Sequence, residues 1–310
     1  MGRVLTFIFF FIFFVFGMGM GLTSGRAQAQ LMVGTTTPDL EALVKAVGGE
    51  DVSTFSVVRG TQDPHQIEAK PSFMVKFRGA DLIVSHGLDL ESAWLDPMTE
   101  GSRNPRIARG TPGFLELGPL LKPIEVKSGP VSRAEGDIHP DGNPHFHLDP
   151  VRLGQAAVIV AVRMGDLAPK KKEPFRVRAR NLQKRLEEKT KDWTARIRKT
   201  GIKEFVSYHK TFSYFADRFG LKNTLHLEPK PGIPPSPSHV LDLIESMKAR
   251  NVKLILIENF FDDSVRGKFQ QAASGVKVLK VPVYVGGEDG VTTNEELIER
   301  LVRTFEEASK

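Results

Sequence analysis

The sequence predicts an α/β protein made of two lobes with parallel sheets, joined by one long rigid helix. Short apolar segments rich in β-branched residues alternate with segments of helical periodicity before residue 170, and this alternation returns after residue 200. A succession of strand, helix and strand favours a parallel sheet. Between the two halves, residues 173–199 contain no glycine and consist mainly of strong helix formers.

The size and composition suit a globular protein with substantial cores. The chain has 310 residues, of which 40% are apolar. Without its first 29 residues it carries 41 basic and 37 acidic residues, and this small excess of positive charge does not indicate nucleic-acid binding. The sequence contains no cysteine, which excludes disulfides and a lipid anchor on an amino-terminal cysteine.

Residues 1–29 have the features of a secretory signal peptide. Arg3 supplies a positive start, an apolar run follows over residues 4–16, and Ala27-Gln28-Ala29 is a small-x-small cleavage motif. We expect cleavage before Gln30 and export to the periplasm. A retained membrane anchor is the alternative, but the apolar run is short for a helix that spans a bilayer.

The first half of the remaining chain contains alternating strand and helix patterns. Strands are predicted at residues 31–35, 52–58 and 81–85. Helices are predicted at residues 38–47, 71–79, 88–94 and 150–164. Glycine and proline interrupt residues 99–143, and we expect a mobile loop over residues 129–143.

The second half repeats the alternation after the long helix. Residues 173–199 carry an apolar stripe on an otherwise charged surface, which predicts one amphipathic helix on the order of 40 Å long. Strands are predicted at residues 204–208, 223–227, 252–258 and 276–281, and helices at residues 211–219, 236–250 and 293–308. We therefore divide the chain into a signal peptide (1–29), a first α/β lobe (30–170), a linker helix (171–200) and a second α/β lobe (201–310).

A proline-flanked segment, Asn143-Pro144-His145-Phe146-His147-Leu148-Asp149-Pro150, holds two histidines. Proline excludes a helix interior and restricts the residue before it, so we expect an extended segment in which side chains two apart share a face. Neutral imidazole is the commonest protein ligand for zinc-like ions. His145 and His147 thus have metal-ligand spacing, although a polar turn that happens to hold two histidines is the alternative.

Two further histidines follow predicted strands. His65, in Asp63-Pro64-His65, comes after the strand at residues 52–58, and His209 comes directly after the strand at residues 204–208. Sites in open α/β sheets lie beyond the carboxyl ends of strands, so we expect both histidines in a crevice between the lobes. With His145 they would supply three ligands of a tetrahedral metal site.

The identity of a fourth ligand is open. Glu228 and Glu258 end apolar strands, and Asp289 lies in a glycine-rich turn, so each is a candidate, as are His147 and a water molecule. For His86 a supporting role at the site competes with a role in a turn. Three remaining histidines are weaker candidates. We expect an exposed His139, with transient capture of metal on the loop as the alternative, and structural roles for His226 and His239.

The sequence lacks the motifs of several enzyme classes. It contains no His-Glu-x-x-His pair, no Gly-x-Ser-x-Gly elbow, no Gly-x-x-x-x-Gly-Lys loop and no cysteine nucleophile. We therefore predict no catalytic residue and a protein that is not an enzyme. The alternative is a secreted zinc-dependent hydrolase, in which Glu228 or Glu258 would act as general base beside a metal-bound water. A third reading is a receptor for an organic solute, or a surface adhesin, on the same scaffold.

The order of the motifs resembles a known family, the metal-binding receptors of zinc and manganese ABC importers. The resemblance covers nearly all of the chain after the signal peptide. It is carried by Asp63-Pro64-His65, Gly87-Leu88-Asp89-Leu90-Glu91, Asn143-Pro144-His145 with Leu148-Asp149-Pro150, and His209 ahead of Phe212-Ser213-Tyr214-Phe215-Ala216.

The resemblance implies two Rossmann-like lobes with one divalent cation held between them and delivered to an ABC permease in the inner membrane. His65, His145 and His209 match the family's first three ligands. Three imidazoles favour Zn²⁺ as the transported ion over Mn²⁺, which prefers sites richer in oxygen. We expect a periplasmic monomer that binds no nucleic acid.

The sequence departs from the family pattern at two places. His147 stands where the family commonly has a tryptophan or another residue that is not a ligand. The family's carboxylate ligand near the last strand has no clear match around residues 283–285. In addition, residues 129–143 hold only His139 where zinc receptors often carry a histidine-rich insert.

Overall fold

The computed structural model describes Gly2, residues 30–129, Gly136, residues 139–272 and residues 275–310. The predicted signal peptide (1–29), apart from Gly2, and residues 130–135 and 137–138 of the predicted mobile loop lie outside this part of the chain. No helix in these described ranges combines the length and the apolar character that crossing a bilayer requires.

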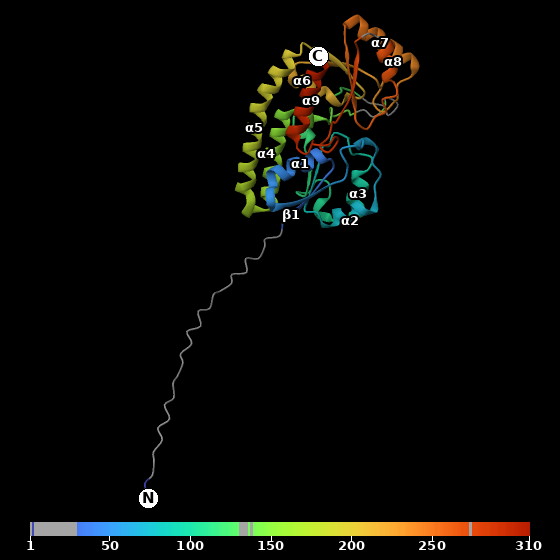
Figure 1. Ribbon diagram of the computed structural model, residues 1–310. Coiled ribbons are helices and arrows are strands. Elements are labelled where there is room, and N and C mark those ends of the chain that lie inside the picture. Colours follow the sequence, from blue (N-terminus) through green and yellow to red (C-terminus); the bar gives the residue numbers. More distant parts are fainter. Residues whose placement is uncertain (1, 3–29, 130–135, 137–138, 273–274) are drawn as a thin grey trace.

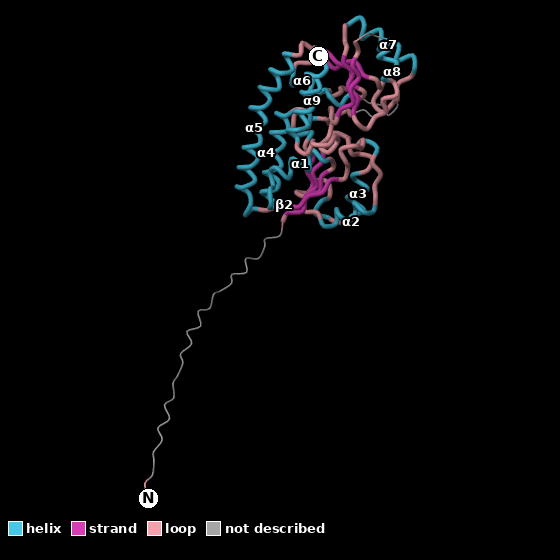
Figure 2. Tube along the Cα trace, in the orientation of Figure 1, coloured by secondary structure: helices cyan, strands magenta, loops and turns pink. Residues whose placement is uncertain are grey.

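Parallel strands form two sheets, one in each half of the molecule (Figures 1 and 2). The described strands are β1 (Leu31–Thr35), β2 (Val52–Ser56), β3 (Leu82–Ser85), β4 (Phe114–Glu116), β5 (Glu204–Ser207), β6 (Lys222–His226), β7 (Leu254–Glu258) and β8 (Lys277–Val281). The strand orders are β2-β1-β3-β4 and β6-β5-β7-β8, and every pairing is parallel. The predicted α/β class with two parallel-sheet lobes is confirmed.

Helices cover both sheets. The described α-helices are α1 (Pro38–Gly48), α2 (Pro71–Gly79), α3 (Leu95–Ser102), α4 (Pro150–Leu167), α5 (Lys172–Lys199), α6 (Ser213–Phe219), α7 (Pro237–Arg250), α8 (Arg266–Ala272) and α9 (Asn294–Ala308). The long helix α5 lies beside α4 along one side of the molecule (Figure 1) and packs against α1 of the first half and α9 of the second. The predicted linker helix is therefore present and touches both lobes.

One apolar core runs through both halves of the molecule. Successive side chains of a strand point to opposite faces of its sheet. On β3, Leu82 and Val84 face this shared core, and on β7 so do Leu254 and Leu256. The opposite faces pack into two smaller cores, one beneath α2 and α3 and the other beneath α7 and α8. Helices α1, α4, α5 and α9 close the shared core from one side.

The prediction of a helix at residues 88–94 is wrong. This segment forms turns, and the helix α3 begins only at Leu95. Leu88 and Asp89 have positive φ angles of 54° and 65°, which an α-helix does not accommodate. The Glu91 carboxylate accepts hydrogen bonds from the backbone N–H groups of His86 and Gly87, which folds the chain back instead. The short elements β4 and α8 were not predicted from the sequence.

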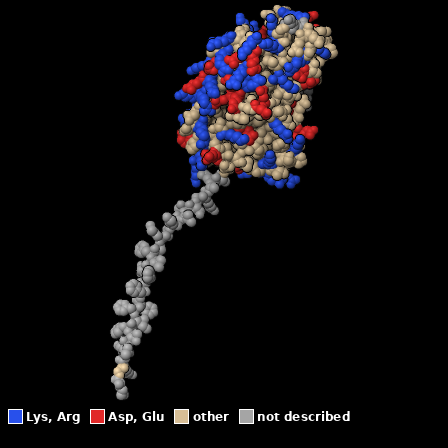
Figure 3. All heavy atoms as spheres, viewed as in Figure 1, with Lys and Arg blue, Asp and Glu red and all other residues tan. Residues whose placement is uncertain are grey.

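Both sheets have the same topology, and it defines where sites can form. In the first sheet β1 lies between β2 and β3, and in the second β5 lies between β6 and β7. In each sheet the strands that follow the central strand lie on opposite sides of it. Such a change of direction leaves a crevice at the carboxyl ends of the strands, here beyond β1 and β3 in the first sheet and beyond β5 and β7 in the second. Charged side chains are interspersed over the face shown in Figure 3 and do not gather in one patch of a single sign.

Candidate metal centre

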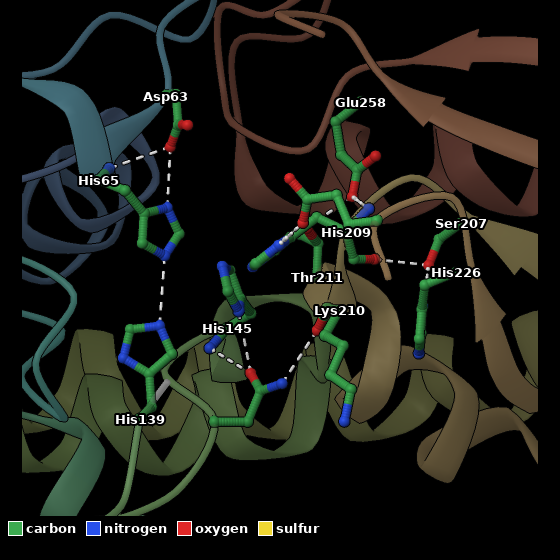
Figure 4. A network of polar contacts seen from close by, with 12 residues as sticks. Asp63, His65, His139, His145, Ser207, His209, Lys210, Thr211, His226 and Glu258 are labelled. Atoms are coloured by element: carbon green, nitrogen blue, oxygen red, sulfur yellow. Dashed lines mark hydrogen bonds and ion pairs between the residues drawn. The ribbon is translucent and has the colours of Figure 1, made fainter. Parts of the chain in front are cut away.

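Three histidines from distant parts of the sequence meet between the two lobes (Figure 4). One ligand atom each of His65, His145 and His209 lies within 4.8 Å of the others. Their ring centroids are 5.2 to 5.8 Å apart. His145 and His209 are buried, and His65 is partly exposed. The structure thus brings together the three histidines selected from the sequence, which we call the histidine triad.

Strand ends and prolines position the triad. His65 lies in a 3-10 turn, Pro64–Gln66, after β2, and the Asp63 side chain caps this turn by accepting from the His65 N–H. His209 follows β5 within two residues. His145 precedes the 3-10 turn Phe146–Leu148, which leads into α4. The expectation that His65 and His209 lie beyond strand ends holds.

An oxygen atom holds Nδ1 of each triad ring. The partners are Asp63 Oδ1 on His65 at 2.8 Å, Asn143 Oδ1 on His145 at 2.9 Å and Glu228 Oε2 on His209 at 2.6 Å. These oxygens accept hydrogen bonds, so the ring proton resides on Nδ1 and Nε2 is the nitrogen of each ring that can act as a metal ligand. Metal-bound histidines show this pattern, because the outer partner fixes the tautomer and the ring orientation.

Asn143 ties the histidines from the two halves together. Its Oδ1 accepts from the His145 backbone N–H, and its Nδ2 donates to the carbonyl of Lys210, the residue after His209. The Tyr214 hydroxyl donates to the Asn143 carbonyl. The segment that carries His145 is thereby anchored to the second lobe beside His209.

The other candidate ligands occupy different positions. Glu228 holds Nδ1 of His209, whereas Glu258 Oε1 accepts from the His209 backbone N–H and from the Thr211 hydroxyl. Burial raises the pKa of Glu258 to about 8. Asp289 is exposed and belongs to no metal-ligand group within the described ranges, and His147 belongs to a second group with Asp39 and His86.

His139 approaches the triad, contrary to the expectation that it would be exposed. Its Nε2 lies 3.2 Å from Nε2 of His65, and its ring centroid is 6.4 Å from that of His145. Burial, with the nearby His65 and His209, lowers the pKa of His139 to about 3. No sequence pattern marks this approach, because it depends on a contact between residues that lie 74 positions apart in the sequence.

The surroundings of His145 keep its imidazole neutral. Burial and the neighbouring imidazoles of His209 and His65 hold the pKa of His145 well below its ordinary value of 6.5. A metal ion binds the neutral form of the ring. Beside the triad lies a cavity of about 500 Å³, lined among others by His139, His145, His209 and Glu125, which provides space next to the ligands.

Comparison with known proteins identifies the family. Residues 33–308 match the family model of ZnuA, described as zinc-uptake complex component A, periplasmic. The chain belongs to the ZnuA family. The family's description as a component of a zinc-uptake complex agrees with the prediction that the protein is a receptor and not an enzyme.

Two proteins of known name and one solved structure are similar to this chain. This ZnuA-family chain is 24% identical over 254 residues to the zinc-binding lipoprotein AdcA of Streptococcus pneumoniae (strain ATCC BAA-255 / R6), covering 81% of this chain and 50% of that protein. It is 25% identical over 224 residues to the high-affinity zinc uptake system protein ZnuA of Yersinia pestis, covering 67% and 69%. The chain thus spans about half the length of the AdcA protein it matches. A mutant of the laminin-binding adhesin Lmb from Streptococcus agalactiae has the same fold, with a TM-score of 0.75 and 27% identity over 91% of this chain and 100% of that chain.

Proposed function

We propose that this protein captures Zn²⁺ between its lobes through His65, His145 and His209 and delivers it to an ABC permease in the inner membrane. The observation that carries this proposal is the convergence of three imidazoles, each held at Nδ1 by an oxygen. Zinc favours such nitrogen ligands in a tetrahedral arrangement, whereas Mn²⁺ favours oxygen. The names of AdcA and ZnuA, as zinc-binding and zinc-uptake proteins, support the same ion.

We propose His139 as the fourth ligand. Zinc–nitrogen bonds of about 2.0–2.1 Å in a tetrahedron place neighbouring ligand atoms roughly 3.3 Å apart. The 3.2 Å between Nε2 of His139 and Nε2 of His65 fits this spacing. Because His139 lies next to His65 and farther from His145, a small inward movement would complete the shell.

We propose that the mature receptor is a periplasmic monomer that begins at Gln30. In this proposal, residues 30–170 and 201–310 are the two lobes and residues 171–200 are the linker, with α5 limiting how far the lobes separate. The packing of α5 against both α1 and α9 supports a rigid connection. Mass spectrometry of the exported protein and its mass in solution test these points.

The decisive experiment measures metal affinity in untagged, chelator-stripped protein. We expect competition titration to show tight Zn²⁺ binding by the wild type, weaker binding of Mn²⁺, and a rise in melting temperature with Zn²⁺. His209→Ala should lose the tight phase and most of the thermal shift. His239→Ala is the matched control, because this histidine lies on α7 and bonds to the His226 carbonyl instead of the triad. Failure of the wild type to bind any divalent ion at micromolar concentration overturns the proposal.

A further inference from the structure

A second group of metal-ligating side chains is buried beside the triad. It consists of Asp39 in the first turn of α1, His86 after β3, and His147, with one ligand atom of each within 4.8 Å of the others. All three side chains are at most 1% exposed. The ring centroids of His145 and His147 are 6.2 Å apart, so this buried group adjoins the triad but does not share a residue with it.

Two backbone carbonyls orient the rings of the buried group. Nδ1 of His86 donates to the Pro144 carbonyl at 3.0 Å, and Nε2 of His147 donates to the Val283 carbonyl at 2.9 Å. A carbonyl only accepts, so each of these nitrogens carries the hydrogen. Nε2 of His86 and Nδ1 of His147 are then the atoms left to act as ligands. This repeats the arrangement of the triad, in which an oxygen holds the opposite nitrogen of each ring.

The Thr37 hydroxyl bonds to Nε2 of His86 at 2.9 Å, but the buried group still contains polar atoms without a hydrogen-bond partner. Within the described structure, Asp39 Oδ1 and Nδ1 of His147 have no hydrogen-bond partner, whereas Asp39 Oδ2 lies 3.2 Å from Nε2 of His86. Buried polar atoms are nearly always paired, because leaving them unpaired costs free energy. A carboxylate and two ring nitrogens that converge in this way form a set of ligand atoms that could hold a cation.

A proton would provide a partner for only part of this ligand set. A second proton on His86 would lie on Nε2, 3.2 Å from Asp39 Oδ2. A proton on that nitrogen pairs with one carboxylate oxygen and leaves the other oxygen and Nδ1 of His147 without partners.

The topology places the buried group where α/β sheets form sites. Asp39 and His86 come from beyond the carboxyl ends of β1 and β3, the crevice of the first sheet. His209 and Glu258 occupy the equivalent crevice between β5 and β7 of the second. Residues of the second lobe close over the group: Tyr284 stacks on His147 at 4.8 Å between centroids, and Asn294 Nδ2 donates to the Asp39 carbonyl.

We propose that Asp39, His86 and His147 form a second site for a divalent transition metal of the zinc type. Two imidazoles and one carboxylate are a known ligand set for Zn²⁺, and also for Fe²⁺. The Thr37 hydroxyl forms a hydrogen bond of 2.9 Å with Nε2 of His86, and a metal bound at this nitrogen would replace that bond. The second site does not rest on the proposed function of the triad. An ion at this site would link α1, the end of β3 and His147. The other ring nitrogen of His147 donates to the Val283 carbonyl in the second lobe.

Metal counting on the full mature chain tests the second site. Chelator-stripped protein is dialysed to equilibrium against micromolar free Zn²⁺, and bound metal is measured by elemental analysis. We expect two equivalents in the wild type, one in Asp39→Asn, one in His209→Ala and none in the double variant. Asp242→Asn, an exposed change on α7, should keep two. Anomalous scattering from zinc-soaked crystals should show a peak between Asp39, His86 and His147.

The possible results separate the second site from the triad. A wild type that binds one equivalent, lost in His209→Ala and retained in Asp39→Asn, overturns the second site and leaves the proposed function standing. One equivalent that is lost in Asp39→Asn and retained in His209→Ala supports the second site and overturns the triad. Should Asp39→Asn fail to fold, the wild-type count and the anomalous map decide, with His147→Gln as the substitute variant.

Discussion

Glu228 Oε2 lies 2.6 Å from Nδ1 of His209, and both side chains are almost completely buried. The carboxylate fixes the tautomer of the ring and makes Nε2 a better electron donor. A negative charge next to an imidazole also stabilises a cation bound on the other side of that ring. Glu228 therefore contributes to metal affinity from outside the ligand shell.

Glu228→Ala should weaken zinc binding about 10- to 100-fold, as loss of an outer partner does in other metal sites. Glu228→Gln should have a smaller effect, because its amide oxygen still accepts from Nδ1 while the charge is lost. Competition titration measures both changes. Glu245→Ala, an exposed substitution on α7, is the control. Equal affinities in all three variants would show that His209 does not need this carboxylate.

Glu258→Gln should remove a pH dependence from the stability of the metal-free protein. The pKa of Glu258 is about 8 when folded, against 4.5 for an ordinary glutamate. Between these values the folded protein retains a proton that the unfolded chain has released, so stability falls as pH rises, by about 1.4 kcal/mol per pH unit. Urea unfolding across this range measures the slope. Glutamine cannot ionise, and an unaltered slope in the variant would contradict the assignment.

His226→Gln should reduce the acid sensitivity of the metal-free protein. Burial, with Lys210 and His209 nearby, lowers the pKa of His226 to about 3 from 6.5. Below pH 6.5 the unfolded chain binds a proton that folded His226 does not. Because of this residue, the free energy of unfolding decreases by about 1.4 kcal/mol for each unit by which the pH is lowered below 6.5. The variant should show one proton fewer taken up on unfolding, and histidine NMR should find the wild-type ring neutral under mildly acidic conditions.

Gly60→Ala should separate the lobes. A Cβ at Gly60 would overlap the backbone of Val285, Gly286 and Gly287 in the second lobe. The Gly60 carbonyl also accepts from Asn259 Nδ2 across the same contact. Overpacking of this kind costs about 1–3 kcal/mol, and we expect a lower melting temperature and weaker metal binding.

Gly79→Ala is the matched control for Gly60→Ala. Gly79 ends α2, and a Cβ there meets no atom within 4 Å. This variant should melt at the wild-type temperature or slightly above it, because alanine favours helix. Small-angle X-ray scattering should show a larger radius of gyration for Gly60→Ala alone. Wild-type dimensions and stability in Gly60→Ala would mean that the loops yield without moving the lobes.

Much of the fold and the triad could be predicted because the signals are local. The apolar stripe of α5 is visible in its sequence, and its predicted members are buried in the structure. His65 and His209 were predicted from their positions after strands. The turn at residues 88–94 was missed because its cause, the Glu91 carboxylate bonding to the backbone, depends on a side-chain contact that residue spacing does not show.

The second group was not predictable from the sequence alone. Asp39 resembles an ordinary acid in the first turn of a helix, and His86 was assigned to a turn or a supporting role. These two residues meet only because β3 pairs with β1 rather than with β2. The contact of His147 with Val283 likewise joins residues from opposite lobes. Such proximity follows from strand order, which a local pattern does not contain.

The shared apolar core has a consequence for how the chain folds. Phe175 and Trp193 lie at opposite ends of α5, yet both belong to the same continuous core as Val33 of the first sheet and Phe305 of the last helix. A fragment ending after α5 would expose the apolar surface that α9 and the second sheet now cover. Each half therefore depends on the other for its own solubility, and the protein should melt as one cooperative unit, with a single calorimetric transition.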